Sequence, residues 1–268
     1  MTKGNLLSGK RGLVMGVAND HSIAWGIARQ AFENGAELAF TYQGEGFGRR
    51  LAPLAESVGS DIVMPCDVED TDSIDAVFAK IEEQWGRLDF LVHSIAYAGK
   101  EELHGRYIET SRDGFARALN ISCFSLTEVS RRAAPLMING GSIITMTYLG
   151  SNRVMPNYNV MGVAKAALEA SVRYLAVDLG DDGIRVNAIS AGSVRTLAGA
   201  GVGGARYVHK FNRDNSPLKR NMGLDEIGSA GIYLLSDLST GVSGEVMHVD
   251  GGFHAVGIPN PANVSEDG

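Results

Sequence analysis

A tyrosine and a lysine seven positions apart are the residues of this chain best suited to chemistry. Tyr158 and Lys165 lie in a segment rich in Ala, Leu, Val and Glu, which favour helix. The helix is expected to start at Asn157, after Pro156, and to end near Leu179. Seven steps of about 100° return nearly to the starting direction, so the phenol and the ammonium share one face. This pattern favours Tyr158 as a proton or hydrogen-bond donor whose pKa is lowered by the neighbouring cation, Lys165. The alternative is that Tyr158 is an aromatic residue at the helix start and Lys165 is a solvated charge.

A short apolar strand, a loop containing glycine and a helix follow one another near the amino terminus. Residues 13–15 predict the strand, and the helix begins near Ile23. This arrangement presents backbone N–H groups at the positive end of a helix, which suits a pyrophosphate. Gly16, Ser22 and Gly26 do not match G-x-G-x-x-G, so an ordinary strand-to-helix turn with two glycines is the alternative.

The end of the second predicted strand bears on which dinucleotide would bind. Residues 37–42 predict this strand, and Gln43 follows where such folds usually carry an acid for the adenosine ribose. Arg49 and Arg50 are close enough in sequence to attract a 2′-phosphate, or they are solvated charges on a helix over 46–58. Taken together, these residues favour NADH over NADPH as the cofactor.

Two further strand ends carry candidate ligand contacts. Asp67 follows a strand over 61–65 and is a candidate for the adenine amino group, with a turn or helix-capping role as the alternative. A fourth strand over 88–93 runs into small residues over 94–98, which let a flat ring approach the backbone. His93 is a lone histidine at a strand end and is interpreted as a hydrogen-bonded structural residue, with a general base as the alternative.

Strands and helices alternate along the whole chain without a repeat or linker. The remaining predicted strands are 142–146, 185–190 and 246–249, and the remaining helices are 71–85, 111–137 and 224–235. This order predicts one domain over 1–268: an α/β, Rossmann-type, doubly wound parallel sheet of about seven strands with helices on both faces.

Two segments are expected to be mobile. Residues 197–205 are rich in Gly and Ala and follow a strand that ends at the ligand edge, which predicts a lid over about 193–215. The alternative is a surface loop without a catalytic part. The Pro- and Asn-rich tail, about 256–268, is expected to be mobile as well.

Composition narrows the partners to small molecules and other proteins. A net charge of −7, a pI near 5.4 and the absence of long basic runs argue against a nucleic-acid or anionic-membrane surface. No metal-ligand spacing is present, so no metal is expected. Cys66 and Cys123 imply no disulfide framework and favour a reducing, cytoplasmic setting, and the amino terminus lacks a signal-peptide core. The uncharged stretch 133–152 is interrupted by Pro135 and Gly140, which argues against a membrane-spanning helix.

Six motifs in this sequence carry a resemblance to a known family. They are GVANDHSIAWGIA (16–28), CDV (66–68), HSIAYA (93–98), TYLGSNRVMPNYNVMGVAKAALEA (147–170), RVNAISAGSVRTLA (185–198) and SGEVMHVDGGF (243–253). The chain resembles the short-chain dehydrogenase/reductase superfamily, and within it the NADH-dependent enoyl-[acyl-carrier-protein] reductases of bacterial type II fatty acid synthesis. Ordinary superfamily members place the tyrosine four residues before the lysine, where this chain has Met161. A tyrosine one turn earlier suits conjugate reduction, because the β-carbon must lie over the hydride donor while the thioester oxygen reaches the phenol.

The resemblance implies a role for each matching residue. Tyr158 hydrogen-bonds the thioester oxygen and stabilises the enolate, Lys165 holds the nicotinamide ribose hydroxyls, and Tyr148 is a second active-site tyrosine. The implied cofactor contacts are Gly16, Ser22, Ile23, Gln43, Asp67, Val68, Ser94, Ile95, Lys165, Val194, Arg195, Thr196, Leu197 and Ala198, and the implied substrate contact is Ala98. Ser193 stands where many relatives carry proline, which puts the rigidity of the lid in doubt.

The implied activity is NADH-dependent reduction of the trans-2 double bond of enoyl thioesters carried by acyl carrier protein. The resemblance further implies a homotetramer packed through the two long central helices and the last helix and strand. A ketone-reducing relative and a nucleotide-sensing protein that binds NADH without turnover are the two rivals. Crotonyl and acetoacetyl thioesters distinguish all three.

Overall fold

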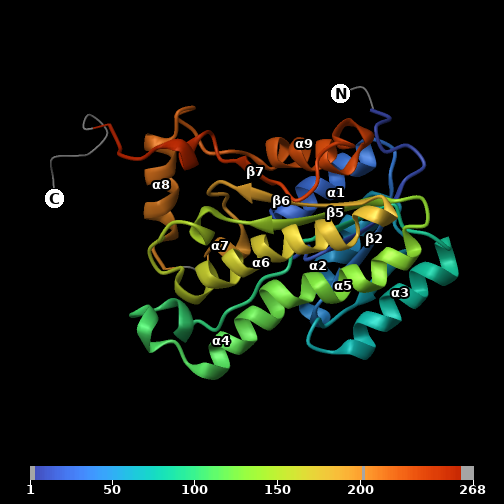
Figure 1. Ribbon diagram of the computed structural model, residues 1–268, viewed down its shortest axis with the longest axis horizontal. Coiled ribbons are helices and arrows are strands. Elements are labelled where there is room, and N and C mark those ends of the chain that lie inside the picture. Colours follow the sequence, from blue (N-terminus) through green and yellow to red (C-terminus); the bar gives the residue numbers. More distant parts are fainter. Residues whose placement is uncertain (1–3, 201–202, 261–268) are drawn as a thin grey trace.

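One parallel sheet of seven strands organises the protein (Figure 1). The computed structural model describes residues 4–200 and 203–260. The strands are β1 (Arg11–Met15), β2 (Glu37–Tyr42), β3 (Ile62–Pro65), β4 (Phe90–His93), β5 (Gly141–Thr147), β6 (Ile184–Ala191) and β7 (Val246–Val249). Their order is β3-β2-β1-β4-β5-β6-β7, and every neighbouring pair is parallel. The direction of winding reverses between β1 and β4, which is where open sheets of this kind bind ligands.

Helices cover both faces of the sheet (Figure 1). They are α1 (Ile23–Glu33), α2 (Gly44–Ser57), α3 (Thr71–Trp85), α4 (Arg112–Leu119), α5 (Ser125–Ala133), α6 (Asn159–Asp178), α7 (Leu197–Ala200), α8 (Ala205–Asn215) and α9 (Leu224–Leu235). One core lies between the sheet and α1, α2 and α9, and a second lies between the sheet and α3, α5 and α6. The predicted doubly wound α/β fold is therefore confirmed.

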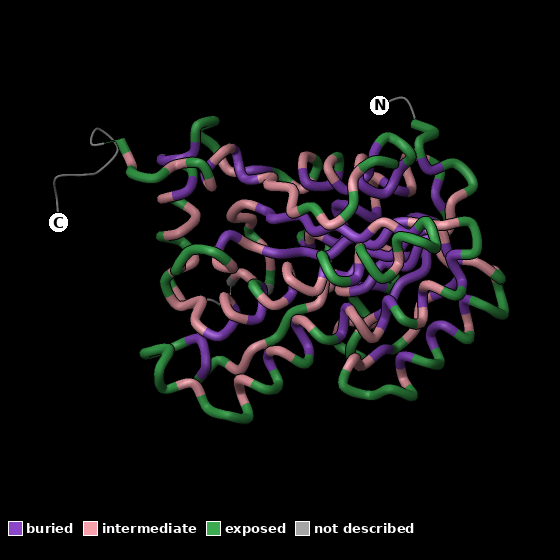
Figure 2. Tube along the Cα trace, viewed as in Figure 1, coloured by how far each residue is buried: buried purple, intermediate pink, exposed green. Residues whose placement is uncertain are grey.

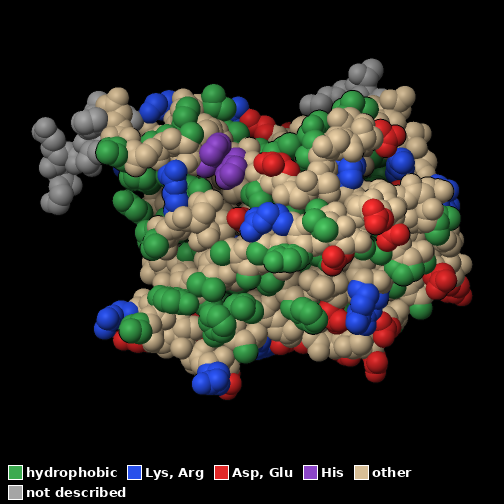
Figure 3. All heavy atoms as spheres, viewed as in Figure 1, with side chains coloured by type: hydrophobic (Ala, Val, Ile, Leu, Met, Phe, Trp, Pro, Cys, Tyr) green, Lys and Arg blue, Asp and Glu red, His purple; other side chains and the backbone are tan. Residues whose placement is uncertain are grey.

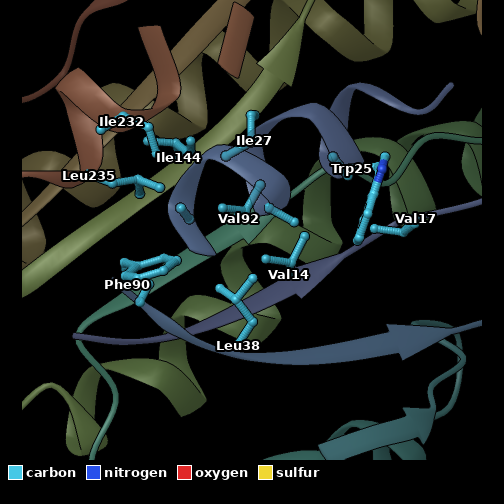
Figure 4. Close-up of a cluster of buried hydrophobic side chains, with 14 of the residues drawn as sticks. Val14, Val17, Trp25, Ile27, Leu38, Phe90, Val92, Ile144, Ile232 and Leu235 are labelled. Atoms are coloured by element: carbon cyan, nitrogen blue, oxygen red, sulfur yellow. The ribbon is translucent and has the colours of Figure 1, made fainter. Parts of the chain in front are cut away.

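The two cores follow from the alternation of side chains along each strand. In β1, Val14 belongs to the first core, whereas Leu13 and Met15 belong to the second. In β4, Val92 points into the first core, where Figure 4 shows it beside Val14. The strands read as continuous apolar runs because both of their faces are covered. Figure 2 shows the consequence, with buried residues along the central strands and a mixture of buried and exposed residues along the outer helices.

The helices differ from the prediction in several places. The predicted helix over 111–137 is divided, because a π-helical turn (Asn120–Phe124) separates α4 from α5. The helix predicted from Asn157 starts two residues later, and Tyr158 is its N-cap. Helix α8 was not predicted, since its sequence is polar on average and lies in the segment interpreted as a lid. In the described parts of the chain, no helix has the length and apolar character needed to cross a membrane.

Candidate active site

The candidate site lies at the carboxyl edge of the sheet, where several predicted segments converge. Met15 at the end of β1 is in register with His93 at the end of β4, and Thr147 at the end of β5 pairs with Ser190 of β6. The loops that follow these strands therefore emerge side by side. One of them, the loop after β5, leads directly into the start of α6.

Two tyrosines come together at this edge. Tyr148 follows β5 and Tyr158 caps α6, and their ring centroids are 5.2 Å apart with an interplanar angle of 74°. The Tyr158 ring packs against the backbone at Gly150, since a Cβ there would lie 2.3 Å from a ring carbon. The edge-to-face geometry is a favourable one for aromatic pairs. The structure thus brings Tyr148 and Tyr158 together although nine residues separate them.

Lys165 is buried within the protein and not exposed on the surface of α6. Only 5% of its surface is exposed, and its Nζ donates a hydrogen bond to the Met146 carbonyl oxygen at 2.8 Å. The interpretation of Lys165 as a solvated charge is therefore wrong. Burial lowers the pKa of this ammonium to about 8, opposed by the nearby Cys123 and Glu169. The lysine is therefore held at the carboxyl end of β5.

Both phenols are protonated at neutral pH. Burial raises the pKa of Tyr158, and the neighbouring Tyr148 and Glu169 raise it further. Burial also raises the pKa of Tyr148 to about 12, partly offset by a hydrogen bond from the Asn212 side chain on α8. The prediction that a cation lowers the pKa of Tyr158 is therefore wrong in this structure, because burial disfavours the charged phenolate. Both hydroxyls are hydrogen-bond donors.

His93 is fully buried and hydrogen-bonded through both ring nitrogens. Its Nε2 is 2.8 Å from the Ser125 hydroxyl, and its Nδ1 is 2.9 Å from the Thr145 hydroxyl. The Ser125 hydroxyl donates a hydrogen bond to the Ile121 carbonyl oxygen at 2.6 Å, so it must accept one from His93. The ring hydrogen of His93 is therefore assigned to Nε2. Burial, together with the charge of Lys165, lowers the pKa of His93 to about 3. The interpretation of His93 as a structural residue fits this geometry.

The loop between β1 and α1 is folded tightly against the end of β4. Gly16 has φ +94°, and a Cβ on it would lie 2.0 Å from the carbonyl oxygen of Ser94. The Ser22 hydroxyl accepts hydrogen bonds from the amides of Ala18 and Asn19 at 3.0 and 3.1 Å, which closes the loop before Ile23 begins α1. The first turn of α1, which follows this loop, has backbone N–H groups that have no partner within the helix. Such a cradle fits a pyrophosphate.

The residues predicted at the adenosine end are adjacent to one another. The Gln43 side-chain amide donates to the Asp67 carboxylate at 3.3 Å, across the ends of β2 and β3. The other Asp67 oxygen accepts the amide of Glu69 at 2.9 Å, so Asp67 does have a turn role. The capping role belongs to Asp70, whose side chain accepts from the first turn of α3. Gln43 and Asp67 together offer amide and carboxylate groups to a nucleoside.

The remaining predicted contacts lie in the segments that follow β3, β4 and β6. Val68 and Ile95 are half-buried against the second core, and Val194 packs against the first. Thr196 caps α7 by accepting the amide of Gly199 at 3.0 Å. Ser94 and Ala98 are half-buried, Arg195 and Leu197 are exposed, and the side chain of Ala198 lies outside the described part of the structure. Residues 201–202 of the predicted lid and 261–268 of the predicted tail also lie outside it.

Two polar residues at the site were missed by the sequence reasoning. Glu169 lies one turn after Lys165 on α6, and it accepts a hydrogen bond from the Thr147 hydroxyl at 2.6 Å. Its spacing of four from Lys165 was a usable signal. Asn212, buried on α8, contacts Tyr148. Nothing local marks Asn212, because only the packing of α8 brings it to the tyrosine.

The fold and the Tyr–Lys pair at the switch-point edge define a nucleotide-dependent reductase of the short-chain dehydrogenase/reductase class. Within that class, the family model described as enoyl-(acyl carrier protein) reductase matches residues 16–254, and the chain belongs to this family.

Similar proteins agree with this assignment. A relative from Rhizobium meliloti, named enoyl-[acyl-carrier-protein] reductase [NADH] 2, is 61% identical over 95% of each chain. A solved enoyl-(acyl-carrier-protein) reductase from Anaplasma phagocytophilum, in complex with NAD, is 54% identical with a TM-score of 0.93, over 97% of this chain and 99% of that one. The Bacillus cereus enzyme, solved with NADP+ and indole naphthyridinone, is 50% identical with a TM-score of 0.93, over 94% of this chain and 99% of that one.

Proposed function

We propose that this protein reduces the trans-2 double bond of enoyl-[acyl-carrier-protein] thioesters to the saturated acyl thioesters, with NADH, as the last reductive step of fatty acid elongation. The observation that carries the proposal is the position of Tyr158, which caps α6 seven residues before the buried Lys165. The family membership supports it, and so do the relatives named NADH-dependent enoyl reductases.

The residues present fit a dinucleotide across the crevice. The close approach of Gly16 to Ser94 and the first turn of α1 make a cradle for the pyrophosphate, and Gln43 and Asp67 face the adenosine. Lys165 has three N–H donors, and one is used by Met146, so donors remain for ribose hydroxyls. The proposed cofactor contacts are Gly16, Ser22, Ile23, Gln43, Asp67, Val68, Ser94, Ile95, Lys165, Val194, Arg195, Thr196, Leu197 and Ala198.

NADH supplies a hydride to the β-carbon of the thioester, and a proton completes the reduction at the α-carbon. The Tyr158 hydroxyl donates a hydrogen bond to the thioester oxygen, where negative charge develops in the enolate. A protonated phenol is the form that this role requires, and burial keeps Tyr158 protonated. Tyr148 packs against the Tyr158 ring and orients the substrate, and Ala98 lines the acyl side.

The assay that tests this function uses the purified protein, NADH or NADPH, and crotonyl or acetoacetyl thioester. Loss of nicotinamide absorbance with the crotonyl thioester and NADH is the expected result. Turnover of the acetoacetyl thioester alone would instead identify a ketone reductase. NADH binding without any turnover would identify a sensor and overturn the proposal.

Two substitutions test the assigned roles. Tyr158→Phe is expected to reduce enoyl turnover by about 10²-fold or more while NADH binding stays nearly unchanged. Lys165→Ala is expected to weaken NADH binding itself. An equal loss of NADH affinity in Tyr158→Phe would contradict the role given to the phenol.

A lid, a homotetramer and a cytoplasmic location complete the proposal. The lid is residues 193–215 over the single domain, supported by the contact of Asn212 on α8 with Tyr148. The tetramer is supported by exposed apolar side chains on α6 and the π-helical turn, with Tyr174 76%, Val177 79% and Phe124 51% exposed. Figure 3 shows hydrophobic side chains gathered on this face over α5 and α6. The cytoplasmic location is supported by two free cysteines.

A further inference from the structure

The backbone on both sides of Tyr158 has an unusual conformation. Among the described residues other than glycine, only Asn157 (φ 58°), Asn159 (φ 38°) and Lys219 (φ 54°) have positive φ. Tyr158, between the two asparagines, has right-handed helical angles of −95° and −28°. The left-handed region is disfavoured for residues with a Cβ, and asparagine tolerates it best after glycine. Two of these three strained residues of the described part of the chain therefore flank the proposed catalytic tyrosine.

The two asparagine side chains donate hydrogen bonds to segments on either side of α6 in the sequence. Asn157 Nδ2 donates to the Gly203 carbonyl oxygen at 2.8 Å, and Gly203 is followed by Gly204, the N-cap of α8. Asn159 Nδ2 donates to the Gly105 carbonyl oxygen at 3.4 Å, in the segment after β4. The amides thus connect the start of α6 to a segment that precedes it by about 50 residues and to one that follows it by a similar interval.

The Tyr158 ring depends on this backbone for its place. It lies against Gly150 on one side and against Tyr148 on another, and the Tyr158 amide donates to the Met155 carbonyl at 3.2 Å. A return of either asparagine to an ordinary backbone region would rotate the intervening residue and move the hydroxyl. An error of about 1 Å in the position of a reacting group is enough to slow a reaction substantially.

We propose that Asn157 and Asn159 are positioning residues of the reaction. Their left-handed backbones orient the Tyr158 hydroxyl. The side-chain amide of Asn157 also connects the start of α6 to the start of α8. The inference rests on the proposed reduction, because it assigns Tyr158 the role described above.

Paired substitutions separate the backbone from the amide. Asn157→Gly keeps the left-handed backbone and removes the amide, whereas Asn157→Ala removes both. We expect Asn157→Ala to lower kcat with crotonyl thioester by about tenfold, with the Kd for NADH within about twofold of wild type. Asn157→Gly is expected to recover kcat to within about threefold but to raise KM, because the connection to Gly203 is lost. At Asn159, the Gly variant is likewise expected to keep a higher kcat than the Ala variant.

Combination with Tyr158→Phe shows whether the asparagine acts through the phenol. Adding Asn157→Ala to Tyr158→Phe should slow turnover by less than about twofold further, since the group it aims is already gone. A further tenfold loss in that background would overturn the positioning role and indicate general destabilisation. Lys219→Ala is the matched control, because it alters the remaining left-handed residue away from Tyr158, and it should leave kcat unchanged.

The outcomes separate this inference from the function on which it rests. An active wild type with Asn157→Ala at wild-type kcat overturns the positioning role alone. A wild type that oxidises no NADH with crotonyl thioester overturns the reduction, and the positioning role falls with it. Thermal melting of each variant identifies any loss of kcat that follows from unfolding.

Discussion

At the scale of single residues, two buried basic side chains, His93 and Lys165, lie near each other at the candidate site. Burial disfavours the charged form of each, so His93 has a pKa of about 3 and Lys165 a pKa of about 8. The charge of Lys165 contributes to the shift at His93. His93 is therefore neutral at every pH at which the protein is expected to work, whereas Lys165 changes charge at the alkaline end.

The neutral His93 makes stability depend on pH. Its pKa falls from 6.5 to about 3 on folding, so below pH 6.5 the unfolded chain binds a proton that the folded protein does not. The free energy of unfolding should decrease as pH falls through this window, by up to about 1.4 kcal/mol per pH unit from this residue. Urea unfolding of wild type and His93→Gln between pH 4 and 8 measures the effect. The wild type should lose more stability than the variant below pH 6.5, and parallel curves would contradict the assignment.

The titration of Lys165 should appear in cofactor binding. Its pKa is lowered from 10.5 to about 8, so its charge is lost as pH rises through about 8 in the free protein. The affinity for NADH should be constant below this value and should decline above it, because the amine then attracts the dinucleotide less strongly. Fluorescence titration from pH 6.5 to 9.5 measures the decline. Lys165→Met is the control: its binding should be weaker and should not show this decline.

At the scale of elements, the β1–α1 loop and the end of β4 form one unit. Gly16 combines φ +94° with a Cβ position 2.0 Å from Ser94 O, so neither its conformation nor its surroundings accept a side chain. The unit holds the crevice in which the pyrophosphate is proposed to bind.

Gly16→Ala is expected to destabilise the protein by about 3 kcal/mol, from overpacking and backbone strain together, and to weaken NADH binding. Gly9→Ala is a matched control, because Gly9 has φ +73° with nothing within 4 Å of its Cβ position. It should cost about 1 kcal/mol from backbone strain alone and leave NADH binding unchanged. Chemical unfolding and a binding titration compare the two variants. Equal effects at both positions would show that the close approach to Ser94 is unimportant.

The π-helical turn is a second element with a consequence for the site. Ser122, within it, accepts the Tyr97 amide at 2.9 Å and donates to the Tyr97 carbonyl at 3.1 Å. Ser125, just after it, holds His93. Two short hydroxyl side chains of this region therefore fix β4 and the segment that follows it.

At the scale of the whole molecule, the proposed tetramer would cover the exposed apolar side chains of α6, Tyr174 and Val177. Val177→Glu should dissociate the proposed tetramer, because a carboxylate would be buried in the subunit interface. Multi-angle light scattering measures the mass of the assembly. Ile108→Glu is the control, since Ile108 is 77% exposed outside α5, α6, α9 and β7, and its mass should not change. A wild-type mass of a single chain would contradict the tetramer.

The amino-acid sequence by itself determined the order and type of most elements. The bounds of β2, α3, α9 and β7 were predicted as they are found, because each is set by local periodicity and by residues that begin or end helices and strands. The shared face of Tyr158 and Lys165 stays a prediction from helix geometry, because Tyr158 is the N-cap of α6 and precedes its first helical residue. Fold class and the location of the site at strand ends were predictable for the same local reasons.

Only the tertiary structure decided the environment of those residues. Burial of Lys165, the raised pKa of Tyr158 and the bonding of His93 arise from groups distant in sequence. The π-helical turn and the left-handed asparagines likewise depend on contacts with other segments of the chain. Residue types and spacing specify local geometry, but desolvation and hydrogen bonding are set by whatever the rest of the chain places around each group.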